Sequence, residues 1–171
     1  MEAKKGRREM KKFELTTESI TNVAGKKLFR IKALIDFGDV KAGEVGGYVE
    51  KEGNVSQDGN AWVSGNTRVY GNAWVYGDAR VYGNARISGD AWVSGNADYT
   101  LIQGFGTEFR CTTFYRGKNK KIMVNCGCFH GDLKEFKKQV KETRSGKIAK
   151  EYLMIADLME NHFASEDSGN E

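Results

Sequence analysis

Three cysteines and one histidine come nearest, by type and spacing, to a metal site. Cys126, Cys128 and His130 follow one another at intervals of two, and Cys111 precedes them. Thiolate and imidazole donors suit tetrahedral zinc, and alternate residues of one strand would share a face. The spacing nevertheless differs from that of the common zinc motifs, and free cysteine often packs as a small apolar residue. We therefore expect these residues to pack beneath the C-terminal helices, with no metal or other cofactor and no catalytic residue.

Arginine and aromatic residues recur through the middle of the chain and offer a different chemistry, which is binding. A guanidinium recognises phosphate through a fork of hydrogen bonds, and aromatic rings stack on bases or bury against a partner chain. We expect nucleic-acid or partner contacts from Arg68, Arg80 and Arg86. We expect an oligomer or partner face that contains Trp62, Tyr70, Trp74, Tyr76, Tyr82 and Trp92.

The first eleven residues are read as a basic arm. With the residue that follows them, they supply the cations Lys4, Lys5, Arg7, Arg8, Lys11 and Lys12. Such a run is either a solvated segment or an arm that binds the phosphates of a nucleic acid. The formal net charge of the whole chain is only +4, so we expect any effect of this charge to be local.

A six-residue repeat must position the arginine and aromatic side chains. Glycine recurs without interruption at Gly47, Gly53, Gly59, Gly65, Gly71, Gly77, Gly83, Gly89 and Gly95. Two positions later comes a small or β-branched residue: Val49, Val55, Ala61, Thr67, Ala73, Ala79, Ala85, Ala91 and Ala97. Two further on comes an aliphatic residue, at Val63, Val69, Val75, Val81, Ile87 and Val93. The alternation is typical of a short strand, and glycine followed by Asn or Asp is typical of a turn.

Strands this short cannot bury their own apolar faces, so they must stack on copies of themselves. The repeat predicts a parallel β-helix over residues 47–100, with about three coils of 18 residues. Trp74 then stacks under Trp92 and Arg68 under Arg86, while Arg80 lies over the tryptophan at position 62. Alanine and valine point into a narrow interior.

The stretch "GNAWVYGDARVYGNARISGDAWVSGNA" resembles the left-handed β-helix of the hexapeptide-repeat superfamily, most closely the variety found in phage and prophage proteins. The resemblance implies left-handed winding and a homotrimer. Acyltransferases and carbonic anhydrases with this fold need histidine near the coils, as a base or as a zinc ligand. Because the coils contain none and the chain has only His130 and His162, we expect no enzyme.

Different patterns flank the repeat. Residues 12–46 predict a β-hairpin that caps the coils, and residues 101–163 predict a small α+β unit of two or three strands and two helices. Asp132 and Glu135 have the spacing of a helix capping box. A second helix is indicated by apolar residues at Ile148, Tyr152, Ile155, Met159 and Phe163. The acidic end at 164–171 predicts a disordered tail.

These patterns favour a mainly β, non-enzymatic binding protein that is located in the cytoplasm. If the protein is phage-encoded, this is the cytoplasm of the host cell. By the phage resemblance, its partner is expected to be a host defence nucleoprotein, which it would inhibit as an anti-CRISPR protein does. One alternative is a sponge for a small signalling nucleotide, clamped in trimer clefts by Arg68, Arg86 and Tyr82. The other is a degenerate hexapeptide acyltransferase. No apolar run reaches the length of a membrane span.

Overall fold

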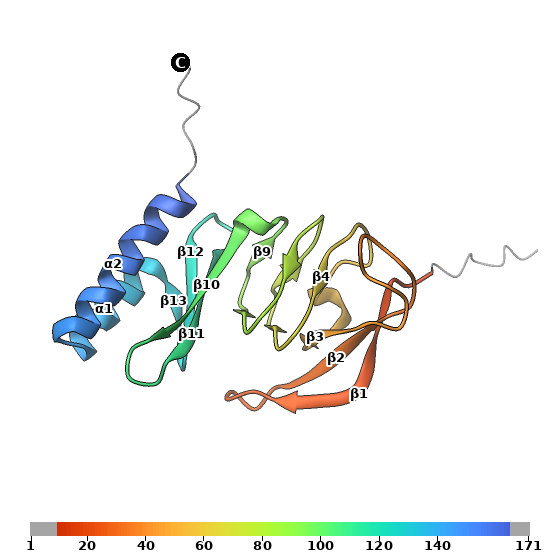
Figure 1. The fold of residues 1–171 in the computed structure, drawn as a ribbon, viewed down its shortest axis with the longest axis horizontal. Coiled ribbons are helices and arrows are strands. Elements are labelled where there is room, and N and C mark those ends of the chain that lie inside the picture. The colour runs from red at the N-terminus through yellow and green to blue at the C-terminus, as the bar shows by residue number, and fades with distance from the viewer. Residues whose placement is uncertain (1–9, 165–171) are drawn as a thin grey trace, which may run out of the picture.

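A computed structural model describes residues 10–164 of the chain. Along the chain come a β-hairpin, a parallel β-solenoid, a four-stranded antiparallel sheet and a pair of helices (Figure 1). Of the basic arm, Lys4, Lys5, Arg7 and Arg8 lie outside the described residues, as does the predicted tail beyond Ala164. The fold is mainly β and contains the expected stack of short parallel strands.

Short strands on three sides build the solenoid. The arginine side contains β3 (Val45–Val49), β5 (Arg68–Val69) and β8 (Arg86–Ile87). The tryptophan side contains β6 (Trp74–Val75) and β9 (Trp92–Val93), and the third side contains β4 (Trp62–Val63) and β7 (Arg80–Val81). Stacked strands are parallel on every side. Arg86 pairs with Arg68, Trp92 with Trp74 and Arg80 with residue 62, so the predicted 18-residue register is confirmed.

The interior has the predicted composition. Ala61, Ala73, Ala79, Ala85 and Ala91 are all 0–1% exposed. The valines and the isoleucine at the aliphatic position are equally buried, and together they form one continuous apolar cluster. Because these alanines are fully buried, we expect a larger side chain at the alanine position to overpack the interior.

The repeat is less regular at its ends than its glycines indicate. The six glycines from Gly59 to Gly89 adopt positive φ angles of 62–72°, which glycine adopts without steric cost. Gly47, Gly53 and Gly95 do not adopt this conformation. The first coil, which contains η1 (Glu52–Asn54), is two residues longer than the others, because Val49 and Val55 pair with residues 20 positions later, whereas Trp62 pairs with a residue 18 positions later. The extra residues therefore lie between Val55 and Trp62, and Val49 and Val55 stack on the aliphatic positions Val69 and Val75 instead of on the small positions expected for them. Ala97, expected to point inward, is exposed because the chain leaves the coils through η2 (Asn96–Asp98).

The hairpin of β1 (Phe13–Thr21) and β2 (Lys27–Ala33) covers the start of the solenoid. The expectation that Trp62 lies on an oligomer or partner face is wrong, because this side chain is 1% exposed. The Trp62 ring packs edge-on against Phe37 at 5.4 Å and against Phe13 at 6.3 Å between centroids. Since β2 pairs antiparallel with β3, the sheet on the arginine side is mixed.

The expectation that Lys12 belongs to the cations of a basic arm is also wrong, because this side chain is 2% exposed. In a parallel stack, some backbone carbonyls of each coil accept hydrogen bonds from the preceding coil. No coil precedes the first one, so its carbonyls need other donors. The Lys12 ammonium donates to three such carbonyls, at 2.7 Å to Ala61, 3.3 Å to Gly59 and 3.5 Å to Asp58. Burial lowers the pKa of Lys12 to about 8, while the charge of Asp58 opposes this shift.

A four-stranded antiparallel sheet covers the other end of the solenoid. Its strands are β10 (Tyr99–Phe105), β11 (Arg110–Arg116), β12 (Ile122–Cys126) and β13 (Phe129–Asp132). The exposed backbone of the last coil finds partners in this sheet: the Arg86 N–H donates to Thr113 Oγ1, and Asn125 Nδ2 donates to the Arg86 carbonyl. Both solenoid ends are therefore closed, by side chains such as Lys12 and Asn125 and by backbone pairing such as that of β2 with β3, rather than left as open strand edges.

Two helices, α1 (Leu133–Thr143) and α2 (Gly146–Phe163), pack on the opposite face of that sheet (Figure 1). The predicted capping box is confirmed, with Asp132 Oδ1 accepting from Glu135 N at 2.8 Å and Glu135 Oε2 accepting from Asp132 N at 2.9 Å. Tyr152, Met159 and Phe163 are buried as the helical spacing predicts. The unit has four strands where two or three were expected.

Candidate anion-binding groove

The floor of the candidate site is the arginine side of the solenoid. In the parallel register of β3, β5 and β8, Tyr48 is opposite Arg68 and Arg68 is opposite Arg86. Neighbouring strands lie about 4.8 Å apart, so the two arginines project side by side. The equivalent turns Gly65–Asn66 and Gly83–Asn84 precede the two strands by the same number of residues. The same type of side chain therefore lies at the same place on this side in consecutive coils.

The two guanidinium groups are poorly compensated. Burial, and secondarily the neighbouring charge of Arg86, lower the pKa of Arg68, although an arginine stays charged at neutral pH. Among residues 10–164, no carboxylate lies within 4.0 Å of the guanidinium of Arg68, Arg86 or Arg110. Adjacent like charges repel, and a bound anion would offset that repulsion.

Two hairpins form the walls of a groove over this floor. Ile20 and Val23 come from the β1–β2 hairpin, whereas Gln103, Phe109 and Arg110 come from β10, β11 and the turn between them. Figure 1 shows both hairpins extending past the coils on the same side of the molecule. The groove has a volume of about 750 Å³, and its lining contains no Asp or Glu. We call it the arginine groove.

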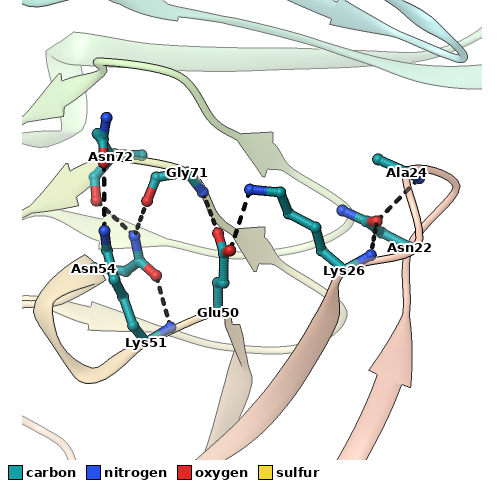
Figure 2. Close-up of polar contacts among 9 residues, drawn as sticks. Asn22, Ala24, Lys26, Glu50, Lys51, Asn54, Gly71 and Asn72 are labelled. Carbon is teal, nitrogen blue, oxygen red and sulfur yellow. Dashed lines mark hydrogen bonds and ion pairs between the residues drawn. The ribbon is translucent and has the colours of Figure 1, made fainter.

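Polar contacts hold the first wall against the coils (Figure 2). The Asn22 carboxamide closes the β1–β2 turn by accepting from the N–H groups of Ala24 and Lys26. Lys26 Nζ then donates to Glu50 at 3.2 Å, and Glu50 accepts from the Gly71 N–H at 2.6 Å. This backbone hydrogen bond is the main cause of a lowered Glu50 pKa. The hairpin tip that carries Val23 is thereby tied to two successive coils.

A column of amides runs along one edge of the groove. Asn66 Nδ2 lies 3.5 Å from Asn84 Oδ1, and Asn84 Nδ2 lies 3.2 Å from Gln103 Oε1. All three residues line the groove. They offer uncharged donors and acceptors beside the cationic floor.

The remaining basic candidates lie elsewhere. Arg80 is on the third side and pairs with Asp39, so it does not join Arg68 and Arg86. Lys11 pairs with Glu52 at 2.9 Å. The expected basic surface is therefore divided, and only two of its described members face the groove.

The tryptophan side keeps an exposed aromatic cluster. Trp74 is 37% exposed and Trp92 is 43% exposed. The Trp74 ring stacks on Tyr76 at 3.9 Å and meets Trp92 edge-on at 6.1 Å between centroids. Tyr82 is also exposed but contacts Tyr99 and does not line the groove, and Tyr70 is half-buried.

The cysteine and histidine cluster differs from its expected geometry. Cys126 ends β12 and pairs with Phe129 of β13, so a turn separates it from His130 and the three residues do not share one strand. Cys126 Sγ accepts from Thr112 Oγ1 at 3.1 Å, whereas Cys111 and Cys128 line the arginine groove. Burial raises the pKa of the Cys111 thiol. His130 Nε2 lies 3.1 Å from the hydroxyl of the buried Tyr115.

Sequence reasoning missed Tyr48, Phe109, Arg110 and Gln103 as groove residues. Tyr48 sits in the first, longer coil, and the others belong to the C-terminal unit, outside the repeat. Only Arg110 carried a usable signal, as an arginine at the start of a predicted strand.

The comparisons with known proteins agree with the coil architecture. The YdcK β-solenoid repeat family matches residues 61–77 and 79–95, which run from β4 at the end of the first coil through β9 of the third coil. This part of the chain is therefore a β-solenoid repeat. No curated protein matches the chain significantly. None of the helices within residues 10–164 is long and apolar enough to cross a membrane.

Proposed function

We propose that the chain is a binding protein whose arginine groove holds a small phosphorylated ligand. One observation carries this proposal: Arg68 and Arg86 lie side by side at the floor of a groove whose lining has no carboxylate. Paired guanidinium groups present planar donors that match phosphate oxygens. When no anion is bound, the two positive charges repel each other, and this repulsion is unfavourable. A bound anion relieves it.

The distribution of the other cations favours a compact ligand over an extended nucleic-acid strand. A single strand is held by a cationic path that follows its backbone. Here Lys12 is buried, Lys11 is paired, and Arg80 is on another side of the solenoid. Within residues 10–164 the unpaired arginines of the coils are confined to the groove.

A titration of inorganic triphosphate tests the proposal. We expect binding by the wild type, and binding at least about tenfold weaker in the double variant Arg68→Gln/Arg86→Gln, since each charge-assisted hydrogen bond contributes roughly 1.5–3 kcal/mol. Arg80→Gln is the matched control, because it removes one arginine of the same repeat outside the groove. Isothermal titration calorimetry at two salt concentrations measures both, with thermal melting to check that each variant folds.

Three results would contradict this function. They are the absence of triphosphate binding, an equal loss in Arg80→Gln, and tighter binding of a single-stranded oligonucleotide with a steep salt dependence. The third would favour the nucleic-acid interpretation instead. Inhibition of a host defence nucleoprotein, which the phage resemblance implies, stays a separate prediction and is tested by adding the protein to a CRISPR nuclease assay.

Homotrimer formation also stays a prediction. The cluster of Trp74, Tyr76 and Trp92 supports it, because its two tryptophans are exposed and such aromatic patches often mark protein interfaces. Light scattering should give three times the chain mass of 19.1 kDa, and Trp92→Ser should lower that mass. A wild-type mass of one chain would contradict the trimer.

A further inference from the structure

Two apolar side chains stand at the mouth of the arginine groove. Val23, at the β1–β2 turn, is 87% exposed, and Phe109, at the β10–β11 turn, is 66% exposed. Both line the groove although more than 80 residues separate them in the chain. The groove therefore has a cationic floor and an apolar mouth.

Phe109 adopts a backbone conformation that is unfavourable for phenylalanine. Its φ angle is +51°, in the left-handed region that bulky residues rarely occupy and that glycine would adopt without steric cost. The turn between antiparallel strands commonly places glycine at such a position. Phenylalanine is therefore an unfavourable choice for the turn itself.

Packing does not explain the phenylalanine either. Its ring belongs to neither of the two apolar clusters formed by the described residues. Strained residues that the fold does not need occur most often at functional sites. The other aromatic ring of the lining, Tyr48, is buried beneath Arg30, whose guanidinium lies 4.4 Å from its centroid. Phe109 is thus the groove ring that is free to stack on a ligand.

We propose that the groove binds a nucleotide whose phosphates contact Arg68 and Arg86 and whose base stacks on Phe109. This inference rests on the proposed function and adds a base to the phosphorylated ligand. A nucleotide has the two ends that the groove requires, one anionic and one planar and aromatic. Arg110 follows Phe109 directly and brings a third cation near the mouth, while the amides of Asn84 and Gln103 offer partners to sugar or base.

The test compares ligands with and without a base. The four ribonucleoside triphosphates and inorganic triphosphate are titrated into the wild type by calorimetry. We expect at least one nucleotide to bind about tenfold more tightly than inorganic triphosphate, which is the effect of one stacked base. Phe109→Gly should remove that difference and leave the affinity for inorganic triphosphate unchanged. Glycine suits the turn, so this variant should melt no lower than the wild type.

Phe109→Tyr is the matched control and should keep the nucleotide preference, because it retains the ring. If inorganic triphosphate binds as tightly as every nucleotide, the base contact is overturned and the phosphate-binding function stands. If Phe109→Gly weakens both ligands equally, or Phe109→Tyr loses the preference, stacking is again overturned. If neither ligand binds the wild type, the proposed function itself fails.

Discussion

Trp62 and Trp92 occupy the same position of the repeat and have opposite environments. Both follow an inward alanine and precede an inward valine, and both lie in two-residue strands. Trp62 is 1% exposed beneath the N-terminal hairpin, and Trp92 is 43% exposed on the tryptophan side. The repeat therefore determines that a side chain points away from the coil axis, and the flanking hairpin determines whether water reaches it.

Truncation of each tryptophan to alanine should show the largest difference between these two equivalent repeat positions. Trp62→Ala is expected to lower the free energy of unfolding by about 3–5 kcal/mol, because it leaves a cavity between Phe13 and Phe37. Trp92→Ala should lower it by less than about 1 kcal/mol, as is usual for surface positions. Urea denaturation of both variants measures the difference.

Trp62→Phe refines the same test. Trp62 Nε1 has no hydrogen-bond partner among the described residues, so phenylalanine removes a buried donor along with part of the ring. Its cost should be clearly smaller than that of alanine. Equal costs for Trp62→Ala and Trp92→Ala would show that the hairpin does not cover Trp62.

The second contrast is between a repeat position inside the coils and the same position past their end. Ala79→Leu should destabilise the solenoid by about 1–3 kcal/mol, because the buried corner has no spare volume. Ala97→Leu, at the exposed last position, should change the melting temperature little. If both substitutions were tolerated equally, the alanine positions would not be packed against the neighbouring coil.

Lys12 should make the stability of the protein depend on pH. The pKa of this buried ammonium is lowered to about 8 from an ordinary 10.5, so between these values the unfolded chain binds more protons than the folded one. The free energy of unfolding of the wild type should consequently rise with pH across this window, relative to Lys12→Met. Urea denaturation of both proteins at pH 7.5 and pH 9.5 measures the change. A wild type that loses stability relative to the variant would contradict the shift.

Local pattern predicted the coils well, for a simple physical reason. A period of two within each hexad determines which side chains point inward, and the small interior requires alanine and valine there. The 18-residue spacing then sets the register, as the pairing of Arg68 with Arg86 shows. The capping box at Asp132 is equally local, since it needs only one turn of helix.

Only the tertiary structure decided which of these side chains are available to a ligand. Lys12 reads as part of a charged arm but closes the first coil, because unpaired carbonyls are found there. The walls of the arginine groove combine Val23, Phe109 and Arg110, which no repeat relates to Arg68. Their meeting depends on how two hairpins pack against opposite ends of the solenoid. Such long-range packing is a sum of many weak contacts between distant segments, and no short pattern of residues contains it.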